Sequence, residues 1–102
     1  MIRRRSLSLE IGSLNGLIQA NGKLPRGFLS VLVQKLKNHE LKPVYKPAGD
    51  TKIHHLDCSD DDWMWLGIQA NKHGLKISRG GRNGLIRALI NGLNGLEEVT
   101  NG

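Results

Sequence analysis

The chain contains two short stretches in which apolar and polar residues alternate with a period of two, as in β-strands that bury one face. These stretches are residues 4–9 and 53–58. The inward positions are Leu7, Leu9, His54, Leu56 and Cys58. The outward positions are Arg4, Ser6, Ser8, Ile53, His55 and Asp57. We predict one strand in each stretch, with an outer face that is mostly polar.

A helical pattern follows each predicted strand. Ser59 and the aspartates at 60–62 form a strong helix start, because the hydroxyl caps free backbone N–H groups and carboxylates favour the positive end of the helix dipole. This helix is expected to end near His73-Gly74, and its counterpart in the first half near Asn21-Gly22. The apolar positions of that counterpart are Ile11, Leu14, Leu17 and Ile18, with Gly12 and Gly16 weakening it.

A second helix is predicted in each half from apolar pairs at helical spacing. Pro25 suits the first turn of one, and Gly81 occupies the cap position of the other. The core positions of the two helices match at an offset of 57. They are Phe28, Leu29, Leu32, Val33 and Leu36 in the first, and Leu85, Ile86, Leu89, Ile90 and Leu93 in the second.

These elements form an internal repeat. The tetrapeptide Ile-Gln-Ala-Asn occurs at 18–21 and again at 68–71, and residues 7–9 align with 56–58 at an offset of 49. Blocks that keep their order while the spacing between them changes are typical of two copies of one unit. We predict a first copy over 1–40, a linker over 41–51, a second copy over 52–94 and a flexible tail over 95–102, all within one compact domain.

Composition narrows the class of protein. The 102 residues suffice for one small domain, and the single Cys58 excludes an internal disulfide framework. No apolar run approaches the ~18 residues of a membrane span, and no signal peptide is recognisable, so we expect a cytoplasmic protein. The net charge is +6, all of it in residues 1–50, which favours a polyanionic partner such as nucleic acid.

The order strand–helix–helix resembles the ribbon-helix-helix family of DNA-binding proteins, of the MetJ and Arc type. Residues 56–93 carry the likeness best, with a short strand, an acidic helix start capped by serine, and the basic run Ser78-Arg79-Gly80-Gly81-Arg82 before the last helix. Residues 4–9 and 24–36 carry it in the first copy. The resemblance implies an α+β, mostly helical fold. Two tandem copies would pair through a two-stranded antiparallel ribbon into a pseudo-dimer within one chain, as in TraY-type accessory proteins of conjugation.

The resemblance also implies a protein without enzymatic activity that binds double-stranded DNA. It would be nucleoid-associated, acting as a transcriptional repressor or an accessory factor at a plasmid or phage origin. No cofactor, metal, small-molecule substrate or membrane is expected, whereas self-association on adjacent DNA sites is. The six outward strand residues would meet base edges in the major groove. Residues expected at phosphates are Arg3, Arg5, Arg26, Gly27, Lys76, Arg79, Arg82 and Asn83.

Several alternatives stay open. The run of Arg3, Arg4 and Arg5 could be a basic arm that does not read sequence. A metal site at His54, His55, Asp57 and Cys58 is disfavoured because adjacent strand residues point to opposite faces. The repeat could instead form a protein-interaction module, such as an antitoxin or a mobile-element inhibitor, that binds an acidic protein surface. RNA binding is disfavoured because the strands lack exposed aromatic residues. Met64 and Trp65 could contact a second molecule.

Overall fold

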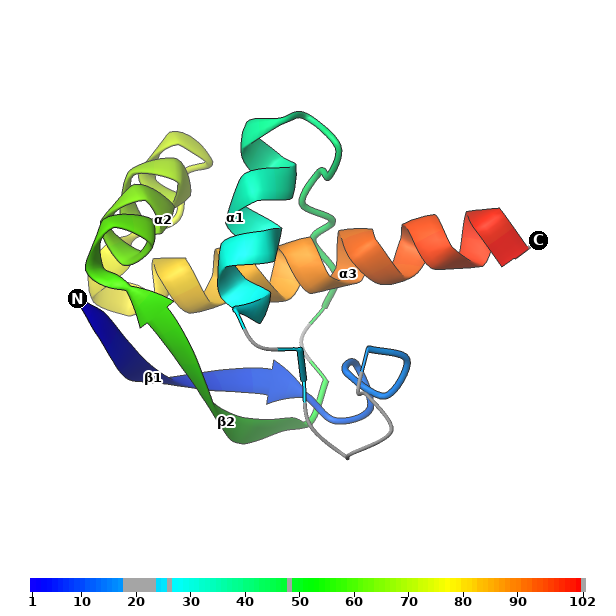
Figure 1. Cartoon of the computed structure of the whole chain (residues 1–102). Coiled ribbons are helices and arrows are strands. Elements are labelled where there is room, and N and C mark those ends of the chain that lie inside the picture. Colours follow the sequence, from blue (N-terminus) through cyan, green and yellow to red (C-terminus); the bar gives the residue numbers. More distant parts are fainter. Residues whose placement is uncertain (18–23, 26, 48, 102) are drawn as a thin grey trace.

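The fold is a two-stranded ribbon covered on one face by three helices (Figure 1). The computed structural model describes residues 1–17, 24, 25, 27–47 and 49–101, with only the backbone described for 96–101. The elements are β1 (Ile2–Glu10), α1 (Phe28–Lys37), β2 (Thr51–Ser59), α2 (Asp60–Lys72), the short 3₁₀ helix η1 (Ile77–Arg79) and α3 (Gly81–Asn101). This is the predicted α+β class, and its order is compatible with a tandem strand–helix–helix repeat.

The two strands pair in an antiparallel register that coincides with the sequence repeat. Ile2 lies opposite Ser59, Glu10 lies opposite Thr51, and Ser6 lies opposite His55. The offset of 49 that aligns the two copies also takes Ser6 to His55. The central pair therefore lies on a pseudo-two-fold axis, about which one strand is exchanged for the other. Each strand extends beyond the alternating stretch that predicted it.

The helices connect the two halves of the chain through their contacts with the strands. α1 packs against β2, and α3 packs against β1, so the last helix of each half contacts the strand of the other half. The buried core is apolar throughout its described residues and draws on every major element. Its largest fully buried side chains are Leu7, Leu9, Leu29, Leu32, Leu41, Leu66, Leu85, Ile86, Leu89 and Ile90. Neither copy could bury these surfaces alone, which agrees with the marginal stability of an isolated hairpin.

The predicted start of α2 is confirmed. The hydroxyl of Ser59 accepts a hydrogen bond from the backbone N–H of Asp62, and the three aspartates occupy the first turn. The helix ends at Lys72, followed by Gly74 in a left-handed conformation. Gly80 is also left-handed and closes η1 directly before α3 begins. These turns direct α3 back beneath α2, with which it packs.

The helix predicted from Ile11, Leu14 and Leu17 is absent from residues 11–17, which form successive turns; Ile18 lies outside the described residues. The hydrogen bonds here span three residues, as from Ser13 N–H to the Glu10 carbonyl. Gly12 has a φ of 85°, a left-handed value that interrupts an α-helix. Leu14 nevertheless reaches the core. The apolar spacing identified the buried residue but not the backbone conformation.

The start of α1 differs from the sequence prediction, and the structure adds contacts within the predicted linker and a helix over the predicted tail. α1 begins at Phe28 with Gly27 as its N-cap, so Pro25 precedes the helix instead of occupying its first turn. The predicted linker over 41–51 contributes Leu41 to the core, and the N–H of Val44 donates to the Ala88 carbonyl of α3. α3 continues through Asn101, into the segment that was expected to be a flexible tail. Among the described residues, no helix combines the length and apolar character needed to cross a membrane.

Candidate nucleic-acid interface

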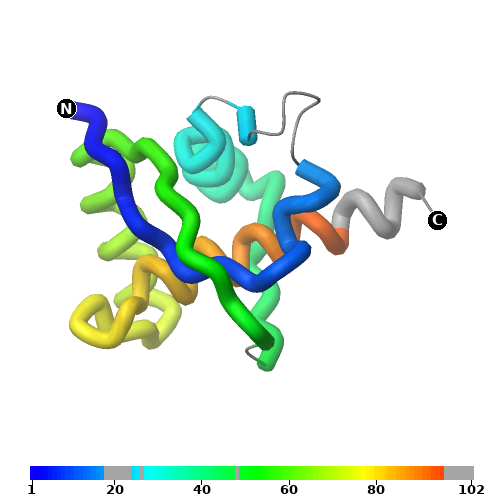
Figure 2. Tube along the Cα trace, turned by 90° about the horizontal axis from the view of Figure 1, so that it is seen from below, coloured from blue at the N-terminus to red at the C-terminus, as the bar shows by residue number. Residues whose placement is uncertain are grey.

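The helices do not cover the outer face of the ribbon. Figure 2, seen from below, shows both strands crossing in front of the helical layer. The six residues predicted to face outward are all exposed. They form three cross-strand pairs, Arg4 with Asp57, Ser6 with His55, and Ser8 with Ile53. The structure therefore brings together every residue that was predicted to read bases.

Two of these pairs make polar contacts across the ribbon. The Nε of Arg4 lies 3.6 Å from Oδ1 of Asp57. The Oγ of Ser6 lies 3.0 Å from Nδ1 of His55. The two groups form a hydrogen bond in which the tautomer of the imidazole decides which one donates. Ile53 has no polar contact to make and is 61% exposed. The face offers a guanidinium, hydroxyls, an imidazole and an apolar side chain, which are the groups that recognise base edges in the major groove.

Arg5 does not lie on this outer face. Its Nη2 donates to Oδ1 of Asp60 at 2.9 Å, and its guanidinium lies 4.8 Å from the ring centre of Trp63. Only 20% of its side chain is exposed. Asp60 also attracts Nε of Arg3 at 3.3 Å and the N-terminal ammonium of Met1 at 3.8 Å. Arg5 is therefore held inside the fold, whereas Arg3 keeps 61% of its side chain exposed.

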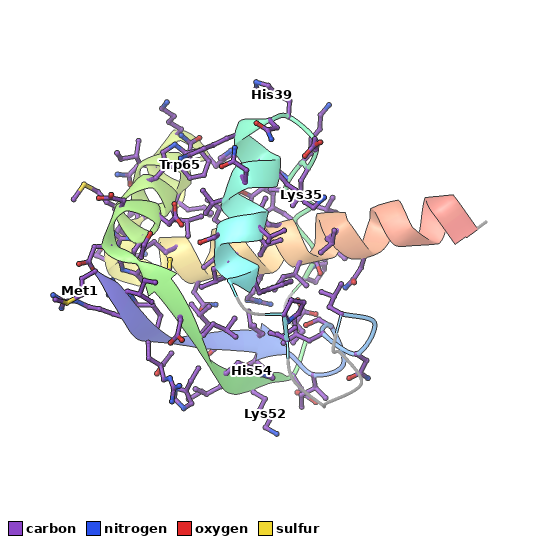
Figure 3. All side chains as sticks on the ribbon, viewed as in Figure 1. Met1, Lys35, His39, Lys52, His54 and Trp65 are labelled. Atoms are coloured by element: carbon purple, nitrogen blue, oxygen red, sulfur yellow. The ribbon has the colours of Figure 1, made fainter. Side chains whose placement is uncertain are left out.

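Sequence reasoning missed the role of Asp60 as the partner of these cations. The offset of 49 gave no signal for this contact, because it aligns the two strands without fixing which of their residues pair; in the observed register the Asp60 N–H donates to the Met1 carbonyl beside the start of β1. Arg3 and Arg5 share the inward parity of Leu7, which also turns them towards the helices. Figure 3 shows Met1 at this end of the ribbon and Lys52 at the opposite end.

The start of α3 is hydrogen-bonded to the ribbon. Asn83 uses both ends of its side-chain amide on the backbone of Ser8: Oδ1 accepts from the N–H and Nδ2 donates to the carbonyl, each at 2.8 Å. Arg82 donates from Nε to the Trp63 carbonyl at 2.8 Å, and its guanidinium lies 5.2 Å from the centre of the Trp63 ring. Both residues were predicted to contact phosphate, and in this structure both make these contacts within the protein.

A basic groove lies beside this end of β1. It has a volume of about 670 Å³, and Ser8, Lys76, Arg79 and Arg87 line it together with glycines of the turn before α3. Lys76 and Arg79 were predicted at phosphates, and both are exposed here. In the first copy, Gly27 is the left-handed N-cap of α1 and lies in open space. Arg26 lies outside the described residues.

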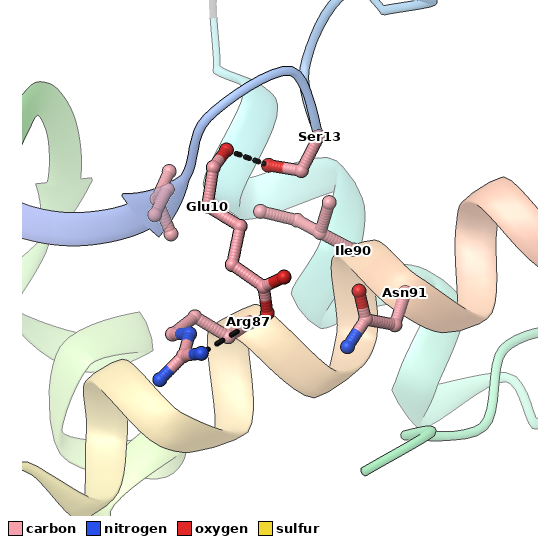
Figure 4. A pocket seen from close by; sticks show the side chains of 6 residues that line it. Glu10, Ser13, Arg87, Ile90 and Asn91 are labelled. Atoms are coloured by element: carbon pink, nitrogen blue, oxygen red, sulfur yellow. Dashed lines mark hydrogen bonds and ion pairs between the residues drawn. The ribbon is translucent and has the colours of Figure 1, made fainter. Parts of the chain in front are cut away.

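Arg87 is a further residue that sequence reasoning did not single out. Its Nη2 lies 3.0 Å from Oε1 of Glu10, and less than a quarter of either side chain is exposed (Figure 4). Ser13 donates its hydroxyl hydrogen to the Glu10 carbonyl at 2.7 Å, next to the same contact. This cluster fixes the end of β1 to α3. No periodicity in the sequence predicts it, because the partners are 77 residues apart.

Cys58 is buried against the helices at the end of β2. Burial raises the pKa of its thiol to about 11, and the nearby carboxylate of Asp62 adds to the effect. The thiol is therefore protonated at neutral pH. His54 and Cys58 lie on the inner side of the strand, and His55 and Asp57 on the outer side. Within the part of the chain that the structure describes, no group of three His, Cys, Asp or Glu side chains could hold a metal ion.

A second groove lies on the helical side of the molecule. It has a volume of about 430 Å³, and α1, the segment after it and α2 line it. Its lining residues are Leu36, Lys37, His39, Leu41, Lys42, Pro43, Trp65, Gln69 and His73. Figure 3 shows Trp65 and His39 on this side, away from the ribbon. The Nζ of Lys37 lies 5.0 Å from the centre of the Trp65 ring, and Met64 is 64% exposed.

No family model, curated protein or solved structure matches this chain.

Proposed function

We propose that this protein is a tandem ribbon-helix-helix protein that binds double-stranded DNA by placing the outer face of its ribbon in the major groove. The observation that carries the proposal is the uncovered face of Arg4, Ser6, Ser8, Ile53, His55 and Asp57. A two-stranded ribbon fits the width of the major groove of B-DNA, and polar side chains on its outer face would reach base edges. The pseudo-two-fold register supports a pseudo-dimer within one chain.

Charge on the described residues supports the same interface. Arg3 and Arg4 are exposed at one end of the ribbon, and Lys76 and Arg79 are exposed beside the other. Cations on both flanks of a ribbon are suited to the two phosphate backbones that border a groove. Arg5, Arg82 and Asn83 would act indirectly, by fixing the ribbon against α2 and α3.

The biological role that follows is regulatory. The protein would be a non-enzymatic, nucleoid-associated factor of the cytoplasm, acting as a transcriptional repressor or at a plasmid or phage origin. It would require no cofactor, and several copies could occupy adjacent sites.

Selection of bound duplexes from a random DNA library tests the proposal. We expect enrichment of a short motif, and binding that weakens steeply with salt, on the order of a thousandfold between 50 and 200 mM for about six phosphate contacts. Arg4→Ala should weaken binding to the selected motif more than binding to random duplex. Lys72→Ala removes the same charge at the end of α2 and should leave the ratio between motif and random duplex unchanged.

Equal weakening of all sequences by Arg4→Ala would show that Arg4 contacts only phosphate. Failure to enrich any duplex would contradict DNA recognition itself.

The groove on the helical side favours a second candidate function, a protein-interaction module of the antitoxin or inhibitor type. The groove combines the apolar surfaces of Trp65, Leu36 and Pro43 with the ammonium groups of Lys37 and Lys42. An acidic protein segment with apolar side chains would match this chemistry. A stoichiometric partner whose binding is lost in Trp65→Ala but retained in Arg4→Ala would support this function.

A further inference from the structure

We infer that this protein recognises an asymmetric DNA sequence and therefore binds duplex DNA in a single orientation. The inference rests on the proposed function, because it concerns the same ribbon face. It is carried by a contrast between the two faces of the ribbon. The pseudo-two-fold axis relates residues of like chemistry on the inner face and residues of unlike chemistry on the outer face.

The inner face keeps the symmetry. The axis exchanges Leu7 with Leu56 and Leu9 with Cys58, so an apolar side chain meets an apolar side chain in each case. Leu7, Leu9 and Cys58 are at most 2% exposed. These positions need similar chemistry because both copies contribute to one core.

The outer face breaks the symmetry at all three positions. The axis exchanges Arg4 with Ile53, Ser6 with His55, and Ser8 with Asp57. A cation is thus replaced by an aliphatic side chain, a hydroxyl by an imidazole, and a hydroxyl by a carboxylate. One end of the ribbon carries the ion pair of Arg4 and Asp57, and the other carries Ser8 and Ile53. A palindromic duplex could not satisfy both ends equally.

The end with Arg4 is suited to guanine. Asp57 approaches the Nε of Arg4, at 3.6 Å, and neither Nη group donates a hydrogen bond to another of the described residues. Two parallel donors from a guanidinium match the O6 and N7 acceptors of guanine. An exposed ion pair of this kind contributes little to stability. The geometry therefore assigns Asp57 a positioning role, as the group that orients the guanidinium across the ribbon.

The end with Ser8 and Ile53 is suited to an A·T pair. Ile53 is 61% exposed and could contact the methyl group of thymine, whereas a serine hydroxyl accepts or donates at any base. Asn83 holds the backbone of Ser8 at both polar atoms, so this end has a fixed position. Residues 4 and 8 are separated by about 13 Å of strand, which equals about four base-pair steps.

An exchange variant tests the inference most sharply. It swaps the three symmetry-related outer pairs by Arg4→Ile, Ser6→His, Ser8→Asp, Ile53→Arg, His55→Ser and Asp57→Ser. The core and all other contacts of the helices stay in place. We expect the variant to bind the selected wild-type motif in the inverted orientation, because the base-reading chemistry has been rotated about the axis while the rest of the chain has not.

Orientation is read by local DNA cleavage. Lys52 is exposed at the Ser8 end of the ribbon, so an iron chelate attached through Lys52→Cys would cleave DNA beyond that end (Figure 3). Cys58 is only 2% exposed, which directs the label to the introduced thiol. We expect cleavage on the thymine side of the motif in the otherwise wild-type protein and on the guanine side in the exchange variant.

Three single-residue variants keep the inference testable if the exchange variant does not fold. Arg4→Ala should reduce discrimination for guanine at one end by about tenfold, and Ile53→Ala should relax the preference for thymine at the other end only. Asp57→Asn should relax guanine discrimination without changing the melting temperature, whereas a merely structural role would change the melting temperature.

A two-fold symmetric consensus, equal cleavage on both sides of the motif, or cleavage by the exchange variant on the wild-type side would each overturn the inference. The first two results would leave DNA binding intact. Failure of the library to yield any motif would instead overturn the proposed function, and the inference with it.

Discussion

At the scale of single residues, several polar side chains near the ribbon form hydrogen bonds with other residues of the protein. Arg5, Arg82 and Asn83 were predicted at phosphates from their charge and their position near a strand or a helix start. The structure gives them partners at Asp60, Trp63 and Ser8. Sequence pattern could place these residues on elements, but it could not identify partners that are 19 to 75 residues away. The outward residues of the strands were predictable because a period of two assigns them to a face without knowledge of any partner.

The two hydrogen bonds between Asn83 and Ser8 should contribute measurably to stability. Asn83→Ala removes both, and we expect a loss of about 1–2 kcal/mol, since a net hydrogen bond contributes about 1 kcal/mol. In a domain of this size the melting temperature should fall by about 4–8 °C for each kcal/mol. Asn71→Ala is a matched control, because the exposed Asn71 side chain makes no hydrogen bond to the described residues. Equal melting temperatures of the two variants would contradict the role given to Asn83.

Because of Cys58, the free energy of unfolding should depend on pH in the alkaline range. Its thiol has a pKa near 9.0 when exposed and about 11 in the fold, so the folded state holds this proton more tightly. The associated stability is complete below pH 9 and is lost as the pH rises from 9 to 11. We expect the difference in unfolding free energy between wild type and Cys58→Ala to shrink across this range in denaturant titrations. A constant difference in unfolding free energy would show that folding does not raise the pKa of the thiol.

At the scale of elements, the apolar spacing correctly predicted α1, α2 and α3, because each presents a continuous buried stripe. It failed for residues 11–17, where the left-handed Gly12 interrupts the backbone and Leu14 reaches the core from a turn. It also gave no indication that the segment after α1 packs on α3. In that contact the backbone of the segment lies close to the backbone of α3. Such a contact produces no hydrophobic periodicity in the sequence.

Gly92 is the residue of α3 that permits this approach. A Cβ at position 92 would overlap the carbonyl oxygen of Lys42, whereas a Cβ at Gly95 would meet nothing within 4 Å. Gly92→Ala should therefore destabilise the fold, by about 1–3 kcal/mol as in other overpacked sites. Gly95→Ala should be neutral or stabilising by up to about 1 kcal/mol, because alanine favours a helix. Calorimetric melting of both variants checks this opposite response, and stabilisation by Gly92→Ala would show that the segment does not cross α3 closely.

At the scale of the whole molecule, the two halves of the chain make one core, because α1 packs against β2 and α3 packs against β1 across a shared ribbon; this arrangement is compatible with two copies of a small unit. The pseudo-symmetry is retained where the copies must pack together and is lost where the ribbon faces outward. The net charge of +6, which comes from residues 1–50, follows the same asymmetry. The repeat and its offset were visible in the sequence, and the strand register agrees with them. The chemistry of the outer face is what distinguishes the two halves.

Methylation interference on a selected duplex tests the central claim most directly, because it reports which groove the protein occupies. Methylation of guanine at N7 alters the major groove, whereas methylation of adenine at N3 alters the minor groove. If the outer face of the ribbon enters the major groove, methylation at guanine N7 within the motif should abolish binding, and Arg4→Ala should remove the effect at one guanine. Interference by adenine N3 methylation alone, with no sensitivity at guanine N7, would contradict the account.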